Sequence, residues 1–174
     1  MKPYLTAITA AFLLIALDVL SAPALFMRAD GHTTVLKAQL REAEPLTIRF
    51  IHSVQKTPVE ENLHVDDELA GFVLDSTRYQ SFGVGLPFLA SEGQFRAEGD
   101  HFVMDGMERR FPRLSLRTGV GTELTLVLDG TEERLFEKLE PGSRIDLAVM
   151  PPWQWGVEKL FGKAHGAANA ARKE

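Results

Sequence analysis

The sequence contains no cysteine among its 174 residues. This absence excludes a disulfide framework, a thiolate metal site and a cysteine nucleophile, and it permits folding in an oxidising compartment without requiring one. The chain also lacks an excess of basic charge, because 19 Lys and Arg residues face 24 Asp and Glu residues, and the formal net charge is -5. A nucleic-acid-binding surface needs a basic patch, so we expect no nucleic-acid partner.

Hydrophobic residues make up 45% and charged residues 25% of the chain, which is enough apolar material for a packed core. At this length we expect one domain with terminal attachments. The predicted boundaries are a signal peptide or membrane anchor over residues 1–27, a polar linker over 28–34, a β-rich domain over 35–150, and a C-terminal amphipathic helix with a frayed tail over 151–174.

The N-terminal segment is almost free of charge. The run Leu5–Leu17 is apolar or small, Asp18 interrupts it, and Val19–Met27 resumes it. A spanning helix needs about 20 apolar residues and a secretory signal needs about 7–15, so an uncleaved anchor and a signal cleaved near Ala22–Pro23–Ala24 both remain open. Because Lys2 precedes the segment, we expect the rest of the chain to lie outside the cytosol. If the segment is retained, Asp18 should face a membrane partner.

Beyond the linker, apolar residues recur at every second position, as in half-buried strands. Asp129–Gly130 is a strong hairpin signal, and Trp153–Phe161 has the spacing of a short helix. We therefore predict an all-β fold, an antiparallel β-sandwich or partly open barrel, with an N-terminal transmembrane or signal helix and a short C-terminal helix. The expected strands lie at Leu46–His52, Glu61–Val65, Phe72–Gln80, Leu114–Arg117, Leu124–Leu128, Glu132–Leu139 and Ile145–Val149.

The densest polar cluster, His52–Glu61, lies between two expected strands. A histidine beside a hydroxyl suggests a nucleophile and its base, but adjacent strand residues face opposite sides, so Ser53 is badly placed to reach His52. Glu60 or Glu61 could instead approach His52 across a hairpin and orient its ring. We favour the alternative in which a buried His–Glu pair pins the hairpin.

A second segment, Tyr79–Pro87, follows a strand and carries Gly83 and Gly85. It lacks the full glycine spacing of a dinucleotide site. The glycines either form a bulge at a barrel corner or present backbone N–H groups to an anion or a partner. The remaining histidines show no ligand spacing, so we expect neither a metal nor a cofactor.

These two segments resemble the DUF1850 family of bacterial exported proteins. The resemblance rests on Phe50–Val54, Thr57–Glu61 and Tyr79–Pro87 in this order, and it runs from about Leu46 to Val149. Members of the family look like companions of TAXI-type tripartite ATP-independent periplasmic (TRAP) transporters. The resemblance therefore implies a non-enzymatic accessory protein at the periplasmic face of the inner membrane, or in the periplasm if the leader is cleaved, which docks on the permease or the solute-binding protein.

Two other functions remain open, a periplasmic module that binds a small ligand inside the β domain and a hydrolase that uses His52 with Glu60 or Glu61. For the favoured accessory role we expect partner contacts from both segments, and from Asp18 inside the membrane. The expected contact residues are His52, Ser53, Thr57, Pro58, Glu60, Glu61, Tyr79, Ser81, Gly83, Gly85 and Pro87.

Overall fold

The computed structural model describes residues 8, 9, 12, 13, 15, 17, 19–82 and 85–157, and most of them form short strands. The strands are β1 (Ala24–Ala29), β2 (His32–Lys37), β3 (Pro45–Ile51), β4 (Pro58–Val65), β5 (Phe72–Tyr79), β6 (Gln94–Glu98), β7 (His101–Asp105), β8 (Arg109–Phe111), β9 (Leu114–Arg117), β10 (Thr125–Leu128), β11 (Thr131–Arg134) and β12 (Arg144–Met150). One helical turn, α2 (Leu135–Lys138), follows β11.

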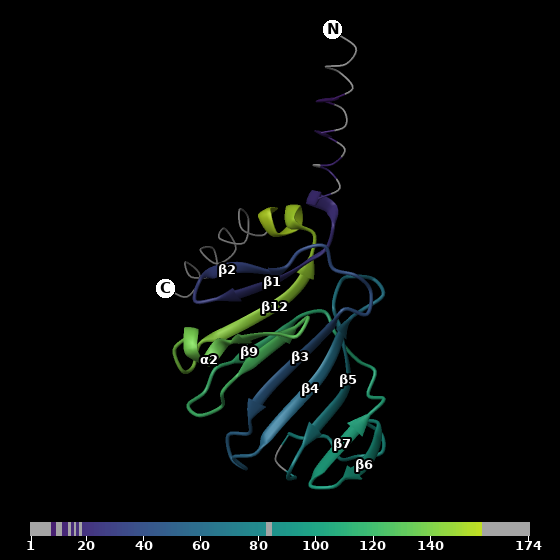
Figure 1. Cartoon of the computed structure of the whole chain (residues 1–174), viewed down its shortest axis with the longest axis vertical. Helices are drawn as coiled ribbons and strands as arrows, with labels where there is room; N and C mark the ends of the chain where they lie inside the picture. The colour runs from purple at the N-terminus through teal and green to yellow at the C-terminus, as the bar shows by residue number, and fades with distance from the viewer. Residues whose placement is uncertain are drawn as a thin grey trace, which may run out of the picture.

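The strands form two antiparallel sheets (Figure 1). The smaller sheet has the order β2-β1-β12-β9, and the larger has the order β11-β10-β3-β4-β5-β7-β6, with β8 also paired to β5. Leu25 and Leu147 of the smaller sheet share one buried cluster with Ile48 and Leu126 of the larger sheet. The expected all-β, antiparallel fold is therefore confirmed, and its main core lies between the sheets.

The alternation along β3 explains how this core forms. Leu46 and Ile48 are buried on the inner face, while Thr47 and Arg49 lie on the outer face. At the β10–β11 turn, Asp129 and Gly130 have φ values of 50° and 72°, as a type I′ turn requires, so the expected hairpin is confirmed. The returning strand is shorter than expected, because it ends at Arg134 and α2 follows.

The expected linker over residues 28–34 is wrong. Arg28 belongs to β1, which pairs with β2 through a second hairpin whose turn residues, Asp30 and Gly31, have φ values of 48° and 77°. The expected end of the leader at residue 27 is also too late, since Ala24–Met27 is buried in β1. The apolar residues of β1 directly continue the apolar leader, so the sequence pattern conceals the boundary between them.

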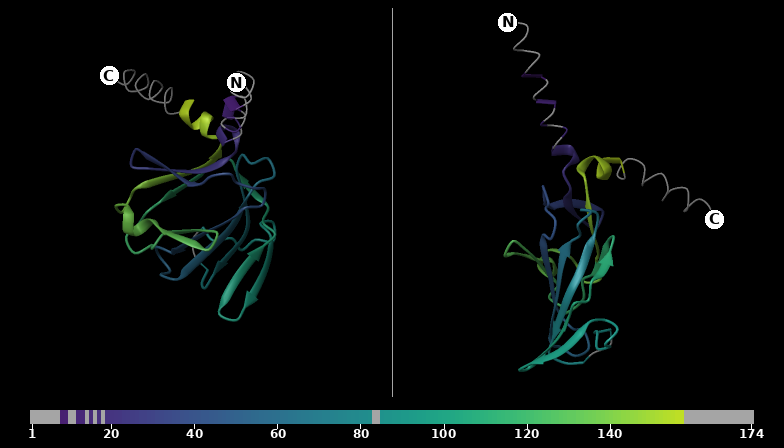
Figure 2. Two further views of the ribbon diagram at one scale, coloured as in Figure 1. Left: turned by 45° about the horizontal axis from the view of Figure 1, so that its top comes forward. Right: turned by 90° about the vertical axis from the view of Figure 1, so that its right-hand side faces the viewer.

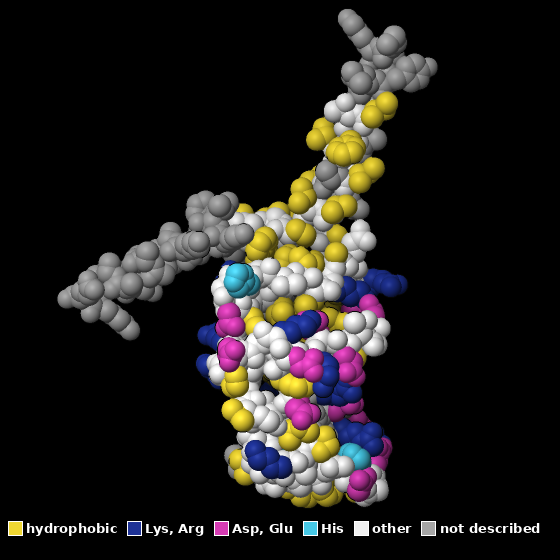
Figure 3. All heavy atoms as spheres, turned by 60° about the vertical axis from the view of Figure 1, so that its left-hand side comes forward, with side chains coloured by type: hydrophobic (Ala, Val, Ile, Leu, Met, Phe, Trp, Pro, Cys, Tyr) yellow, Lys and Arg dark blue, Asp and Glu magenta, His cyan; other side chains and the backbone are white. Residues whose placement is uncertain are grey.

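The N-terminal segment leaves the β domain at the end where β12 finishes (Figures 1 and 2). Its described residues between positions 8 and 21 are helical. Their large apolar side chains are 49% to 75% exposed, and Figure 3 shows them along the stalk above the domain. Among the residues that the structure describes, no helix combines the length and apolar character needed to cross a bilayer. Asp18 lies outside the described residues, so its expected membrane contact stays a prediction.

The start of the expected C-terminal helix is present, since residues 152–157 are helical. Trp155 stacks on Phe26 of β1, with ring centroids 5.6 Å apart and an interplanar angle of 14°. This contact belongs to a small second cluster on the outer face of the smaller sheet, with Ala24, Ala148 and Met150. The rest of the expected helix and the tail lie outside the described residues.

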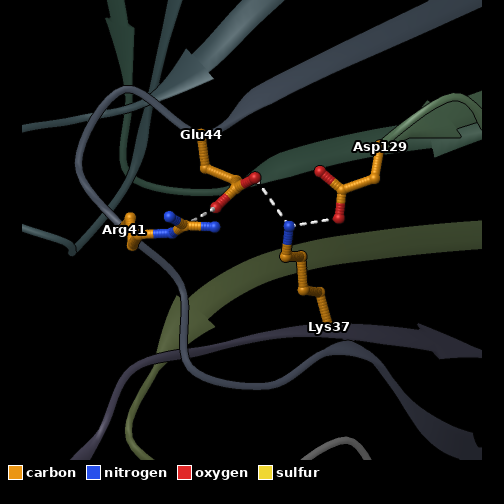
Figure 4. A network of polar contacts seen from close by, with 4 residues as sticks. All are labelled: Lys37, Arg41, Glu44 and Asp129. Atoms are coloured by element: carbon orange, nitrogen blue, oxygen red, sulfur yellow. Dashed lines mark hydrogen bonds and ion pairs between the residues drawn. The ribbon is translucent and has the colours of Figure 1, made fainter.

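A polar network joins the two sheets (Figure 4). Lys37, at the end of β2, donates to the Glu44 carboxylate at 2.6 Å and to the Asp129 carboxylate in the β10–β11 turn. The hydrogen bond to Asp129, followed by the one to Glu44, raises the pKa of Lys37, and the same contact lowers the pKa of Asp129. Arg41 lies 4.0 Å from the other oxygen of Glu44.

Candidate functional site

The two motif segments meet at the end of the domain opposite the N-terminal segment (Figure 1). The hydroxyl groups of Thr57 and Ser81 are 3.2 Å apart, within hydrogen-bonding distance. Val59 of β4 pairs with Tyr79 of β5, and the Tyr79 hydroxyl donates to the carbonyl oxygen of Pro87. The fold therefore joins two segments that are separated in sequence. Gly83, an expected contact residue, lies outside the described residues.

His52 is built into the turn between β3 and β4 and is only 8% exposed. Its Nδ1 accepts hydrogen bonds from the backbone N–H groups of Val54 and Gln55, at 3.3 and 3.1 Å. Its backbone N–H donates to the carbonyl of Thr57, and its carbonyl accepts from the N–H of Lys56, both at 2.9 Å. The Nδ1 lone pair of His52 is therefore engaged by the backbone of its own turn.

The two adjacent glutamates of β4 point to opposite faces of the larger sheet. In the strand register, Glu60 lies directly opposite Arg49 of β3 on one side and Arg78 of β5 on the other, and these side chains share the outer face. Glu61 pairs with Ile48 and Thr77, both buried on the inner face. The expectation that either glutamate could approach His52 is therefore wrong for Glu60.

A cavity of about 360 Å³, here called the inner pocket, opens between the two sheets at this end. It lies beside the main core, and residues from β3, β4 and β9 line it together with the loop at Gly85. Its apolar lining includes Ile48, Phe50, Leu86, Leu116 and Leu124. Its polar lining includes His52, Ser53, Glu61, Arg117 and Thr122.

Glu61 is the acidic group of the inner pocket. Burial raises the pKa of its carboxyl group, and the positive charge of Arg109 on β8 opposes this effect. Among the residues that the structure describes, none forms a hydrogen bond or an ion pair with this carboxylate. The expected pair between His52 and a glutamate is therefore wrong. The His52 ring is instead held by the backbone N–H groups of Val54 and Gln55.

The outer face of the larger sheet carries a group of charged residues of which the sequence analysis named only Glu60. A second cavity, of about 410 Å³, is lined by Arg49, Glu60, Arg78 and Arg134 among others. Arg49 forms an ion pair with Glu132 of β11. No spacing along one strand signals this cluster, because its members meet only through the strand register.

An exposed aromatic cluster, here called the distal surface, lies beside the motif segments. Phe82 stacks on Phe102 of β7 at 4.4 Å between ring centroids, and Phe95 of β6 stacks on Phe102 at 5.7 Å. Phe82 is 54% exposed and Phe95 is 43% exposed. Of these rings, the sequence analysis covered only Phe82, as part of the segment Tyr79–Pro87.

The described residues contain no group of three or more His, Asp and Glu side chains placed to hold a metal ion. A family model described as "Domain of unknown function (DUF1850)" matches residues 46–135, slightly more than half of the chain. The match spans both motif segments and runs from β3 to the first residue of α2. No curated protein and no solved structure matches the chain.

Proposed function

Because the chain belongs to the DUF1850 family, we propose that it is a non-enzymatic accessory protein of a TAXI-type TRAP transport system. In this proposal the N-terminal segment holds the protein at the periplasmic face of the inner membrane. The β domain then docks on the solute-binding protein or the permease. The association with transporters comes from the family resemblance. The structure supports three parts of the proposed role: membrane attachment, docking on a partner and the lack of catalysis.

The exposed N-terminal side chains support membrane attachment. Ile8, Phe12 and Leu13 are large apolar residues that the described β domain leaves exposed. Exposed apolar surface of this kind is unfavourable in water and favourable in lipid. A bilayer would bury these side chains without any change in the β domain.

The observation that carries the docking proposal is the place of the distal surface. It lies with the motif segments at the end of the domain away from the N-terminal segment (Figures 1 and 2). With that segment in the membrane, the distal surface faces the periplasm. Exposed apolar patches mark interaction sites in soluble domains. Of the two expected partners, this position favours the solute-binding protein.

The state of His52 supports a role without catalysis. Its Nδ1 lone pair is occupied by the N–H groups of Val54 and Gln55, and Glu60 lies on the other face of the sheet. The hydrolase alternative requires a histidine that can accept a proton. This geometry is better suited to shaping the turn.

Co-purification from native membranes tests the proposal. We expect the tagged full chain to retain the solute-binding protein after crosslinking, and the double variant Phe82→Ser and Phe95→Ser, which removes the exposed rings of the distal surface, to lose it. Val35→Ser is the matched control, because Val35 is also an exposed apolar residue but lies on β2. Failure of the wild-type chain to retain either transport component would contradict the proposal.

The inner pocket favours a second candidate function, a module that binds a small ligand. Ligand sites are usually concave, mostly apolar and equipped with a few polar groups, as this pocket is. A ligand that binds only the folded chain raises its melting temperature. A thermal-shift screen of small amines, acids and alcohols tests this function, and a flat response to all three classes would reject it.

A further inference from the structure

We propose that the inner pocket binds the ammonium group of a small apolar amine, with Glu61 as its counter-ion. This inference rests on the second candidate function and adds the charge and shape of the ligand. It follows from the direction in which Glu61 points, from the groups around it and from the apolar walls of the pocket.

The strand register directs Glu61 into the interior. Its cross-strand neighbours on either side, Ile48 and Thr77, are both buried. The Thr77 hydroxyl donates its hydrogen to Sδ of Met107, at 3.5 Å, so this proton is not given to Glu61. A carboxylate in such surroundings is unfavourable unless a hydrogen-bond donor or a cation reaches it.

The charged and titratable groups that the structure describes near Glu61 do not supply a cation or a hydrogen-bond donor to its carboxylate. Arg117 lines the same pocket, but its guanidinium donates to the carbonyl oxygen of Gly142 at 2.7 Å. His52 holds the turn through Nδ1, and Arg109 of β8 influences Glu61 without forming an ion pair with it. Among the described residues, none therefore places a cation against the carboxylate.

The rest of the pocket suits a hydrocarbon body. Phe50, Leu86, Leu116 and Leu124 line it, and its volume of about 360 Å³ fits a small molecule. An ammonium head group would supply both charge and donors to Glu61. A carboxylate ligand would instead be repelled by Glu61, and an alcohol would supply a hydrogen bond without the charge.

Three probes of equal chain length separate these ligand classes: hexylamine, hexanoate and hexanol. Binding to the full chain in mild detergent is measured by calorimetry and thermal shift. We expect hexylamine to bind best and its Kd to rise about tenfold or more in Glu61→Gln, since a charge-assisted hydrogen bond is lost. Glu60→Gln is the matched control, with the same substitution one residue away on the opposite face, and should bind like the wild type.

A direct readout uses the wild-type chain and does not depend on whether the variant folds. Bound ammonium favours the ionised carboxylate, so saturating hexylamine should lower the pKa of Glu61 in an NMR titration. An unchanged pKa would overturn the inference. If hexanoate or hexanol binds while hexylamine does not, the inference fails and the ligand-binding function stands. If no probe of any class binds, both fail.

Discussion

The imidazole of His52 acts on the β3–β4 turn through two hydrogen bonds to backbone N–H groups. Replacing His52 with Ala would leave the N–H groups of Val54 and Gln55 without this acceptor and would open space around a buried side chain. We expect a loss of about 1–3 kcal/mol in the free energy of unfolding, measured by urea denaturation.

His52→Asn is the control for this prediction. The amide oxygen of Asn lies close to where Nδ1 of histidine lies, and it can accept from the same N–H groups. We expect Asn to recover a substantial part of the loss. Equal destabilisation by Ala and Asn would show that the ring packs in the turn without holding its backbone.

Glu61 predicts a specific dependence of stability on pH. Because its pKa is raised in the folded chain above its ordinary value of 4.5, the unfolded chain releases this proton first as the pH rises. The free energy of unfolding of the wild-type chain therefore falls as the pH rises from 4.5 through the raised pKa of Glu61 in the folded chain. Glu61→Gln has no carboxyl group at this position, so it does not show this loss of stability. We expect the variant to gain stability relative to wild type at about pH 8 but not at about pH 4, by urea denaturation. A difference that is equal at both pH values would contradict the assigned burial effect.

At the scale of elements, the strands with one buried face could be predicted from the sequence. β5 spans Phe72–Tyr79, close to the expected Phe72–Gln80, because its inward residues are strongly apolar. β6 could not be predicted, since all five of its residues are exposed and it has no buried face to create a pattern. The contacts of His52 with its turn are not predictable either, because they depend on the turn geometry, including the positive φ of 55° at Lys56.

The network around Lys37 offers a test of how the two sheets are joined. Lys37→Met would remove the cation beside Glu44, a carboxylate that is buried at the junction (Figure 4). We expect the variant to lose about 1–3 kcal/mol of stability, because a buried acceptor loses its donor. Chemical denaturation at neutral pH measures the change.

Asp129→Asn provides the comparison within the same network. The φ of Asp129 is 50°, a conformation that Asn adopts readily in type I′ turns, and the amide oxygen can still accept from Lys37. We expect little change in stability. If Asp129→Asn lowered the free energy of unfolding more than Lys37→Met does, the contact of Lys37 with Asp129 in the turn would matter more than its contact with Glu44.

At the scale of the whole molecule, the two ends differ in character. The apolar leader and residues 152–157 lie at one end, and the motif segments with the distal surface lie at the other (Figures 1 and 2). The family match covers only residues 46–135, yet Ala24–Ala29 of β1 and Ile145–Met150 of β12 pair with each other outside it. The folding unit is therefore larger than the matched region, and β1 should be indispensable to it.

Two truncations test this dependence on β1. A chain starting at Pro23 keeps β1, whereas a chain starting at Val35, the expected start of the domain, loses it. The second chain lacks Leu25, Phe26 and Met27, and burial of each such side chain contributes about 1.5–3 kcal/mol. Together they approach the whole stability of a typical domain, about 5–15 kcal/mol. We expect a cooperative thermal transition by circular dichroism from the first chain and none from the second. Equal melting temperatures would mean that the larger sheet folds without the strand that pairs with β12.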